Sequence, residues 1–129
     1  MREIKFRAWI EKDKKMVDLS SLEFDRCGFP EAEGDQILFE VGYRKRKSDW
    51  VYKTARNIVV MQYTGLKDRY NTEIYEGDYV IGINRITEAE IEHEVTFLNG
   101  CFMFGNWNAH EYFNKHAEIF ISGNKFENK

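Results

Sequence analysis

Residues 62–83 form the stretch that most constrains the fold of this 129-residue chain. The stretch leaves an apolar run, crosses a polar segment at residues 65–72, and enters a second apolar run through the corner Glu76-Gly77-Asp78. Glycine adopts the positive φ of a tight corner, and an acidic side chain beside it can cap the turn. The pattern predicts a strand, a turn and another strand, with structural turn residues at Gly65, Asn71, Gly77 and Asp78.

Alternating apolar and polar residues predict strands in the first half of the chain. In residues 2–10 one face carries Ile4, Phe6, Ala8 and Ile10, and the opposite face carries Lys5, Arg7 and Trp9. A period of two is typical of a half-buried strand. The apolar pattern resumes at residues 16–24, so the simplest pairing is a hairpin between residues 3–10 and 16–24. Further strands are predicted at residues 37–41, 50–52 and 57–63, the last of them central in its sheet.

The second half of the chain predicts another hairpin and one helix. Residues 89–98 alternate again, and their apolar face carries Ile91, His93, Val95 and Phe97. Asn99-Gly100 then separates two β runs, which strongly predicts a two-residue turn with positive φ at both positions. In residues 108–116 the apolar and aromatic side chains follow helical spacing, with Asn108 as the predicted cap. Residues 117–122 predict the last strand.

These elements predict an all-β fold: a small barrel or sandwich of many short antiparallel strands, with one short helix near residues 108–116. Aromatic residues make up 16% of the chain, which supplies large side chains for a β core. The length predicts a single domain over residues 1–129. Turn formers and a basic run predict exposed loops near residues 25–36 and 42–50.

Segment composition also predicts a compartment. No segment approaches the roughly 18 apolar residues of a membrane span, and the first ten residues lack the apolar core of a signal peptide. The two cysteines, Cys27 and Cys101, are expected to be reduced thiols. We therefore expect a protein of the cytoplasm that does not associate with membranes. The net charge is +2 over residues 1–60 and −5 over residues 61–129, which suggests two faces of unlike sign.

One basic run is the candidate surface for nucleic acid or another partner. It consists of Arg44, Lys45, Arg46 and Lys47, with Trp50 close behind. Cations contact phosphates, and aromatic rings stack on bases. The alternative is a solvated hairpin tip whose aromatic residues belong to the core below, and the net charge of −3 favours this alternative.

Other candidates for chemistry have structural alternatives. Glu76 and Asp78 are a possible carboxylate pair, but capping or solvation of the corner by these acids is the preferred interpretation. A metal site needs three or four convergent ligands. His110 and His116 are six residues apart and lie on different faces of the predicted helix, so they do not form the core of such a site. A Cys–His nucleophile pair stays open, because its members meet in space rather than in sequence. The acidic residues at 88, 90, 92 and 94 are explained by a solvent-facing strand, with mimicry of nucleic acid as the alternative. We predict no catalytic residues, no metal and no cofactor.

Three segments, taken in order, resemble the YopX proteins, a family from phages and prophages. The first is MREIKFRAW at residues 1–9 with KKMV at residues 14–17. The second is MQYTGLKD at residues 61–68 with EIYEGDYV at residues 73–80, and the third is Gly123-Asn124 with FEN at residues 126–128. The chain has Tyr70-Asn71 where the family usually has Asn-Gly, and Ile10 where it usually has an acid. The resemblance implies a mostly β protein whose function is not established.

We therefore predict a non-enzymatic phage or prophage accessory protein that binds another macromolecule in the bacterial host cell. The partner is expected to be an unidentified phage or host protein, and the aromatic content predicts a homo-oligomer. The alternative is a small-barrel binder of single-stranded nucleic acid that uses the basic and aromatic segment at residues 44–52. An unrecognised hydrolase is a third hypothesis.

Overall fold

The computed structural model describes residues 3–24, 39–46, 49–54 and 58–127, with side chains described for residues 3–20 and 58–127. The chain divides into two compact units, one made of residues 1–5 and 61–129 and the other of residues 6–60. Short antiparallel strands and one short helix make up the secondary structure of these described residues, so the predicted all-β fold is confirmed. The single domain over residues 1–129 stays a prediction.

In the unit of residues 6–60, the first hairpin joins β1 (Phe6–Ile10) to β2 (Lys15–Asp18) with Ala8 opposite Val17. Ala8 and Ile10 are buried, and Val17, Leu19, Ile58 and Val60 pack against them. The pairing with β1 ends where the Leu19 N–H donates to the Phe6 carbonyl at 3.0 Å. β1 begins at Phe6, so no strand residue is left to pair with the chain beyond Leu19. The predicted hairpin is therefore correct for residues 16–19 and wrong for residues 21–24.

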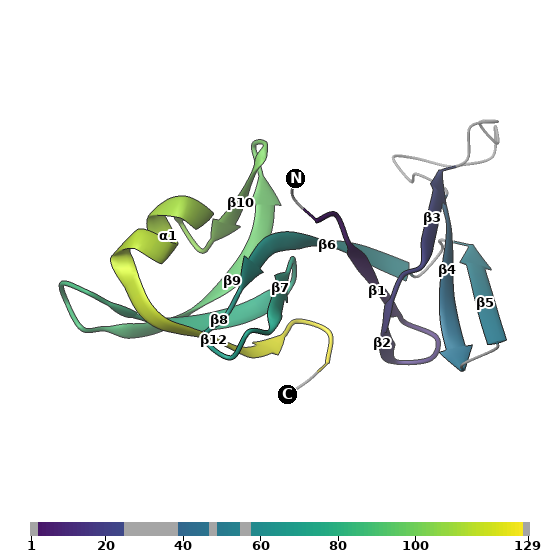
Figure 1. Cartoon of the computed structure of the whole chain (residues 1–129), viewed down its shortest axis with the longest axis horizontal. Coiled ribbons are helices and arrows are strands. Elements are labelled where there is room, and N and C mark those ends of the chain that lie inside the picture. The colour runs from purple at the N-terminus through teal and green to yellow at the C-terminus, as the bar shows by residue number, and fades with distance from the viewer. Residues whose placement is uncertain (1–2, 25–38, 47–48, 55–57, 128–129) are drawn as a thin grey trace. The chain divides into compact units, whose positions relative to one another are not determined.

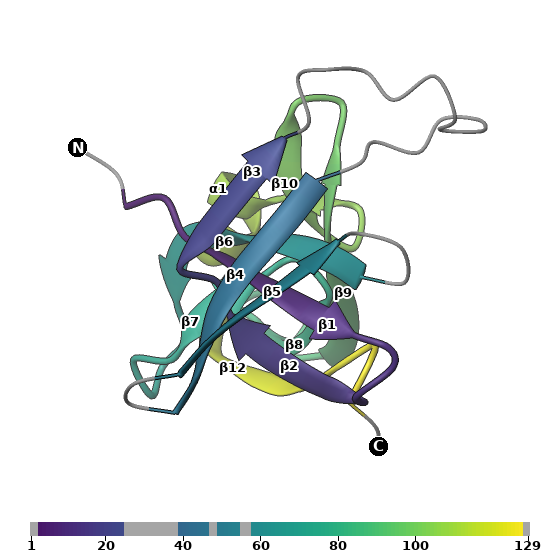
Figure 2. The same cartoon turned by 90° about the vertical axis from the view of Figure 1, so that its right-hand side faces the viewer.

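The next strand pairs elsewhere. β3 (Ser21–Phe24), β4 (Phe39–Arg46) and β5 (Asp49–Thr54) form a three-stranded antiparallel sheet in the order β3-β4-β5, as Figure 2 shows. The prediction of a loop at residues 42–50 is therefore wrong for most of its length, because strand pairing continues to Arg46 and resumes at Asp49. The predicted loop at residues 25–36 lies outside the described residues.

Trp9 corrects the prediction that its face of β1 is exposed. The side chain is only 6% exposed, and its indole N–H donates to Glu11 Oε2 at 2.7 Å. The indole ring is covered while its polar N–H still reaches a carboxylate, so both faces of β1 are buried near its end. Ile4, which precedes the strand, is 60% exposed instead.

Strand β6 (Ile58–Lys67) is longer than predicted and contains Gly65. In the unit of residues 61–129, β6 pairs with β7 (Glu73–Tyr75), and the register shifts between Tyr63 and Lys67. Gly65 has φ +86, so its conformational freedom serves an irregularity inside a strand rather than the predicted turn. The turn itself begins at Asp68 and includes Asn71 with φ +67.

The same unit contains a five-stranded antiparallel sheet with the strand order β11-β10-β9-β8-β12, which curls into a half-barrel (Figure 1). Its strands are β8 (Asp78–Asn84), β9 (Glu90–Leu98), β10 (Cys101–Phe104), β11 (Trp107–Asn108) and β12 (His116–Asn124). The core is made of buried residues from the strands and the helix: Ile74, Val80, Val95, Phe104, Tyr112 and Ile119.

Two corners of this unit have the backbone that their sequences require. Asn99 and Gly100 have φ +52 and +84 and connect β9 to β10 in a two-residue turn. Gly77 has φ +87, and the buried Asp78 accepts the Tyr75 N–H at 2.8 Å. Asp78 is therefore a group that caps the corner, in agreement with the interpretation of this acid as a capping residue rather than as a member of a reactive carboxylate pair.

Helix α1 (Ala109–Lys115) lies where the helical spacing predicts it. The Asn108 side chain accepts the Glu111 N–H at 2.8 Å and caps the helix. Tyr112 is fully buried and anchors α1 in the core. This packing stabilises a helix that is too short to be stable by itself. Within the described residues, no helix has the length and apolar character needed to span a membrane.

The predicted apolar face of β9 is buried only in its middle. Val95 is 1% exposed, whereas Ile91 is 57% and Phe97 is 50% exposed. Phe97 lies near the hairpin tip and packs edge to face with Phe102, at a centroid distance of 5.0 Å, instead of entering the core. Glu88, the first of the four acids, lies in the turn before β9 with φ +61.

Candidate functional site

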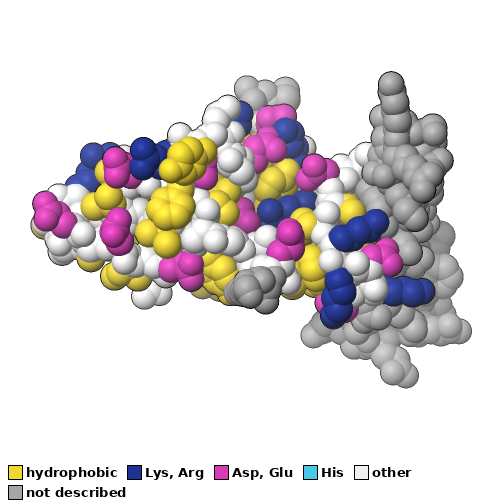
Figure 3. Space-filling model, turned by 90° about the horizontal axis from the view of Figure 1, so that it is seen from below, with side chains coloured by type: hydrophobic (Ala, Val, Ile, Leu, Met, Phe, Trp, Pro, Cys, Tyr) yellow, Lys and Arg dark blue, Asp and Glu magenta, His cyan; other side chains and the backbone are white. Residues whose placement is uncertain are grey.

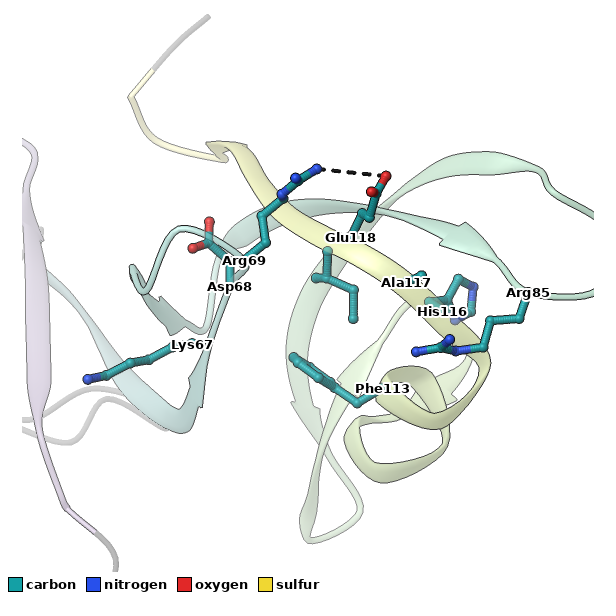
Figure 4. Close-up of a pocket in the computed structure, with 9 residues that line it drawn as sticks. Lys67, Asp68, Arg69, Arg85, Phe113, His116, Ala117 and Glu118 are labelled. Carbon is teal, nitrogen blue, oxygen red and sulfur yellow. Dashed lines mark ion pairs between the residues drawn. The ribbon is translucent and has the colours of Figure 1, made fainter.

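An open pocket of about 280 Å³ lies in the unit of residues 61–129 (Figure 4). Three segments line it: residues 67–69 at the end of β6, Arg85 in the turn after β8, and the junction of α1 and β12. The junction contributes Phe113 and residues 116–119. The pocket therefore depends on three segments that are distant in sequence.

Backbone hydrogen bonds fix the segments that carry the arginines. The Arg69 N–H donates to the Ile119 carbonyl at 2.8 Å, and the Arg85 N–H donates to the Lys115 carbonyl at 2.9 Å. Each bond ties a loop to the junction of α1 and β12. The backbones that carry both arginines are therefore held in place, while the side chains extend from the surface.

Asp68 organises the turn that carries Arg69. Its Oδ1 accepts the N–H groups of Tyr70 and Thr72, both at 2.9 Å, and its Oδ2 accepts the Ile121 N–H at 3.1 Å. Both carboxylate oxygens are thus engaged by backbone donors. This arrangement makes Asp68 a structural group of the pocket rather than a free base.

A bulge in β12 shapes the opposite wall. Ala117 pairs with Ile83 and Phe120 pairs with Ile81, so the pairing gains one residue on β12 between these points. Glu118 lies in this bulge with φ +52, a region that costs a non-glycine residue about 1 kcal/mol or more. Bulges and unfavourable backbone angles occur often beside binding sites, where they redirect side chains.

The basic side chains at the pocket differ in their partners. Arg69 forms an ion pair with Glu118 at 3.7 Å, and its guanidinium lies 5.2 Å from the centre of the Tyr70 ring. In the part of the chain that the structure describes, Arg85 has no ion-pair partner. Lys67 points away from the other labelled side chains (Figure 4). Arg85 is therefore the cation available to a ligand.

Charge is distributed unevenly in this unit. Residues 61–129 contain 6 Lys and Arg against 11 Asp and Glu, a net charge of 6 − 11 = −5. Acidic side chains are spread among hydrophobic ones over the face shown in Figure 3. Three of the six cations nevertheless line this one pocket. Asp68 and Glu118 line it as well, so the three cations and two acids give the pocket a net charge of +1 on an acidic unit.

A buried aromatic cluster lies behind the pocket and includes His116. The His116 Nδ1 lies 2.9 Å from the Tyr112 carbonyl, so Nδ1 carries the proton, because a carbonyl only accepts. The His116 ring stacks on Tyr112 at 4.1 Å and meets Trp107 edge to face at 5.1 Å. These contacts fix the tautomer and the orientation of the imidazole.

Burial shifts the pKa of His93 and of Tyr112 in the direction that favours their neutral forms. Burial lowers the pKa of His93 from its usual 6.5, and nearby His116 lowers it further. Burial also raises the pKa of Tyr112 to about 12. The Tyr112 hydroxyl is buried without a hydrogen-bond partner among the described residues. Among the side chains that the structure describes, the cluster shows no hydrogen-bonded nucleophile and base of the kind that covalent catalysis uses.

The basic residues predicted from the sequence lie in the unit of residues 6–60. Arg44, Lys45 and Arg46 end β4, and Arg44 pairs across the hairpin with Trp50 of β5. Lys47 lies outside the described residues. The backbone register of the β4–β5 hairpin therefore places Arg44 and Trp50 at opposite positions, while the pocket is built from other residues.

The remaining candidates that the structure describes do not gather into a site. Among the described residues, no group of three His, Cys, Asp or Glu is placed to hold a metal ion. The Cys101 thiol is exposed, lying 3.5 Å from the Leu98 carbonyl and 3.6 Å from the Met103 sulfur. His110 contacts Asn114 at 3.1 Å on the exposed side of α1. Cys27 lies outside the described residues.

Sequence reasoning missed the two arginines of the pocket. Arg69 and Arg85 are separated by sixteen positions and belong to no motif. Only the contacts of their turns with β12 and α1 bring them to one pocket. The unequal charge of the two halves was the one signal available, since cations are scarce in residues 61–129.

These features define a β half-barrel protein with an open pocket that Arg69 and Arg85 line. The family model described as YopX protein matches residues 5–128, so the chain belongs to the YopX family. A solved structure, that of protein EF1440 from Enterococcus faecalis, is similar to this chain with a TM-score of 0.65 and 20% sequence identity. The match covers 99% of this chain and 96% of that one, and at this identity it shows the fold alone. A search of curated proteins finds no match.

Proposed function

We propose that this YopX protein is a non-enzymatic phage or prophage accessory protein that binds another macromolecule in the cytoplasm of a bacterial host. The observation that carries the proposal is that the acidic and basic side chains of the pocket differ in whether they already have partners. Asp68 is engaged by three backbone N–H groups, whereas the Arg85 side chain is exposed and has no ion-pair partner among the described residues.

This difference between Asp68 and Arg85 supports a binding function rather than catalysis. General acid–base and nucleophilic catalysis require a reactive group within hydrogen-bond reach of a base. At this pocket the Asp68 oxygens and the His116 Nδ1 are committed to backbone partners. Arginine, by contrast, is enriched among the residues that dominate binding energy in protein interfaces.

Affinity capture tests the proposal. The full chain is immobilised, incubated with lysate of a phage-infected or lysogenic bacterium, and the retained macromolecules are identified by mass spectrometry and nucleic-acid sequencing. We expect a defined partner to be enriched over an unrelated protein of similar size and charge. Equal recovery on both supports would contradict the proposal.

Self-association is part of the same proposal. Phe97 and Leu98 at the β9–β10 tip are 50% and 57% exposed, and Ile86 is 81% exposed. Exposed apolar side chains of this size support contact between copies of the chain. Light scattering over a range of concentrations is expected to show a mass above 15.4 kDa, and a strict monomer at high concentration would contradict this part.

The alternative function is binding of single-stranded nucleic acid through residues 44–52. The pairing of Arg44 with Trp50 in the β4–β5 hairpin supports it, because cation and aromatic contacts act together on such strands. Fluorescence titration with an oligonucleotide at low and high salt tests it. Salt-sensitive binding would support this function, and absence of binding at low salt would exclude it.

A further inference from the structure

The turn that carries Arg85 is ordered by hydrogen bonds, while the Arg85 side chain is exposed. The Asn84 side chain accepts the N–H groups of Ile86 at 2.9 Å and Thr87 at 3.0 Å, which orders the backbone around Arg85. The Arg85 N–H is itself bonded to the Lys115 carbonyl. A guanidinium on such a turn loses little backbone entropy when it binds a ligand.

An apolar surface lies beside this guanidinium. Phe113 is half-buried and packs edge to face on Phe104, at a centroid distance of 5.6 Å, while Ile119 is only 6% exposed and belongs to the core. Figure 4 shows the Arg85 side chain extending toward Phe113 and His116. A ligand here meets a planar cation and an ordered aromatic ring together.

The charge of the surrounding unit favours one class of ligand. A nucleic acid strand extends beyond the pocket and encounters a unit with a net charge of −5, which repels a polyanion. A single carboxylate meets the Arg85 fork at short range and makes charge-assisted hydrogen bonds with it. A pocket of about 280 Å³ is near the lower end of ligand sites and suits one or two side chains.

We infer that the pocket binds an acidic peptide segment of a protein partner, with a carboxylate on Arg85 and a neighbouring apolar side chain on Phe113. This inference rests on the proposed function and names the chemistry of its partner. Arg69, already paired with Glu118, forms the far rim and contacts the peptide only where a second acid displaces Glu118.

Nuclear magnetic resonance of the isotopically labelled full chain tests the inference. The probes are capped hexapeptides with a central Glu flanked by Leu or Phe, and the same peptides with Gln in place of Glu. We expect the Glu peptides to shift the signals of the Arg85 side-chain N–H and the Phe113 ring. The Gln peptides are expected to bind about tenfold more weakly, because a charge-assisted hydrogen bond is lost.

Two exposed-cation variants sharpen the test. Arg85→Gln is expected to weaken peptide binding about tenfold. Lys115→Gln removes the same charge from a nearby exposed residue that does not line the pocket, so it is expected to leave binding unchanged. Both side chains are exposed, and a dispersed spectrum confirms that each variant is folded.

Several outcomes would overturn the inference. These are no shift at millimolar peptide, equal binding of Glu and Gln peptides, and equal effects of the two variants. Stronger shifts of the same signals by an oligothymidine than by the peptides would assign the pocket to nucleic acid instead. If an Arg85→Gln bait still captures the lysate partner at wild-type yield, this inference fails while the proposed function stands.

Discussion

Strands β9 and β12 both pair with β8, but they do so differently. β9 keeps one register from Tyr79 opposite Glu94 to Ile83 opposite Glu90. β12 changes register twice, first between Ala117 and Phe120. The pocket lies on the irregular side and uses the residues of that first change. The regular strand stabilises the sheet, whereas the bulged strand directs side chains into a site.

Gly82 is where this difference becomes a packing constraint. It lies in β8 opposite the bulge, and a Cβ there would be 2.8 Å from the Tyr112 hydroxyl and 3.0 Å from Ile119 Cγ1. His116 Cβ would lie 3.1 Å away. The absence of a side chain at Gly82 therefore permits α1 and β12 to pack closely on β8.

The largest effect is expected from Gly82→Ala. The added methyl group overpacks the core against Tyr112 and Ile119, and we expect a loss of about 1–3 kcal/mol of unfolding free energy. Urea unfolding followed by tryptophan fluorescence measures the loss. The same experiment on Gly123→Ala is the control, because a Cβ at Gly123 in β12 meets no atom within 4 Å. Equal losses in the two variants would show that the close approach at Gly82 is not a constraint.

Local patterns predicted the regular parts of the fold. The Asn99-Gly100 turn, the Asn108 cap and the corner at Gly77 are determined within a few residues of sequence. Their backbone angles and hydrogen bonds follow from the conformational freedom of glycine and asparagine and from short polar side chains. Such features need no knowledge of distant contacts.

The irregular parts could not be predicted in the same way. The bulge at Glu118 breaks the alternation that identifies a strand, and nothing near it in sequence marks a positive φ for a glutamate. Alternation alone places Trp9 on the exposed face, because the alternation pattern carries no information on what covers a strand. Arg69 and Arg85 meet at one pocket through long-range pairing, which sequence periodicity does not encode.

The second effect is a dependence of the unfolding free energy on pH. It involves His93 on β9 and His116 on β12, the two strands that pair with β8. His93 lies on β9, and its pKa is lowered by burial and by His116 on β12. The unfolded chain therefore binds a proton more readily than the folded one, so stability is full above pH 6.5 and falls as the pH drops below it. Urea midpoints measured between pH 8 and pH 5 give the slope.

Two substitutions separate His93 from the other titrating groups. His93→Gln is expected to reduce the fall in stability below pH 6.5, because glutamine does not titrate. His110→Gln changes an exposed histidine of α1 and is expected to leave the slope as it is. An unchanged slope in His93→Gln would mean that burial and the neighbouring His116 do not lower the pKa of His93.

A smaller gain is expected from Tyr112→Phe. The Tyr112 hydroxyl is buried without a hydrogen-bond partner among the described residues, so its removal is expected to stabilise the fold by about 1 kcal/mol. It should also abolish the part of the alkaline destabilisation above pH 10 that comes from the raised pKa of Tyr112. Loss of more than about 1 kcal/mol would instead reveal a partner for the hydroxyl, such as a buried water.

The smallest effect distinguishes the two strands directly. Glycine in place of Glu118 removes an unfavourable positive φ worth about 1 kcal/mol, which offsets the backbone entropy that glycine adds to the unfolded chain. The Arg69 ion pair lost in this change is solvent-exposed and contributes about 0.5 kcal/mol or less. We therefore expect Glu118→Gly to be nearly neutral in urea unfolding.

The matched change in the regular strand is Glu90→Gly. Glu90 is exposed, pairs with Ile83 and has no positive φ, so glycine there is expected to cost about 0.5–1 kcal/mol. The difference between the two variants isolates the backbone strain in the bulge. A loss in Glu118→Gly as large as in Glu90→Gly would mean that the bulge stores no strain, and the pocket would then owe its shape to side-chain packing alone.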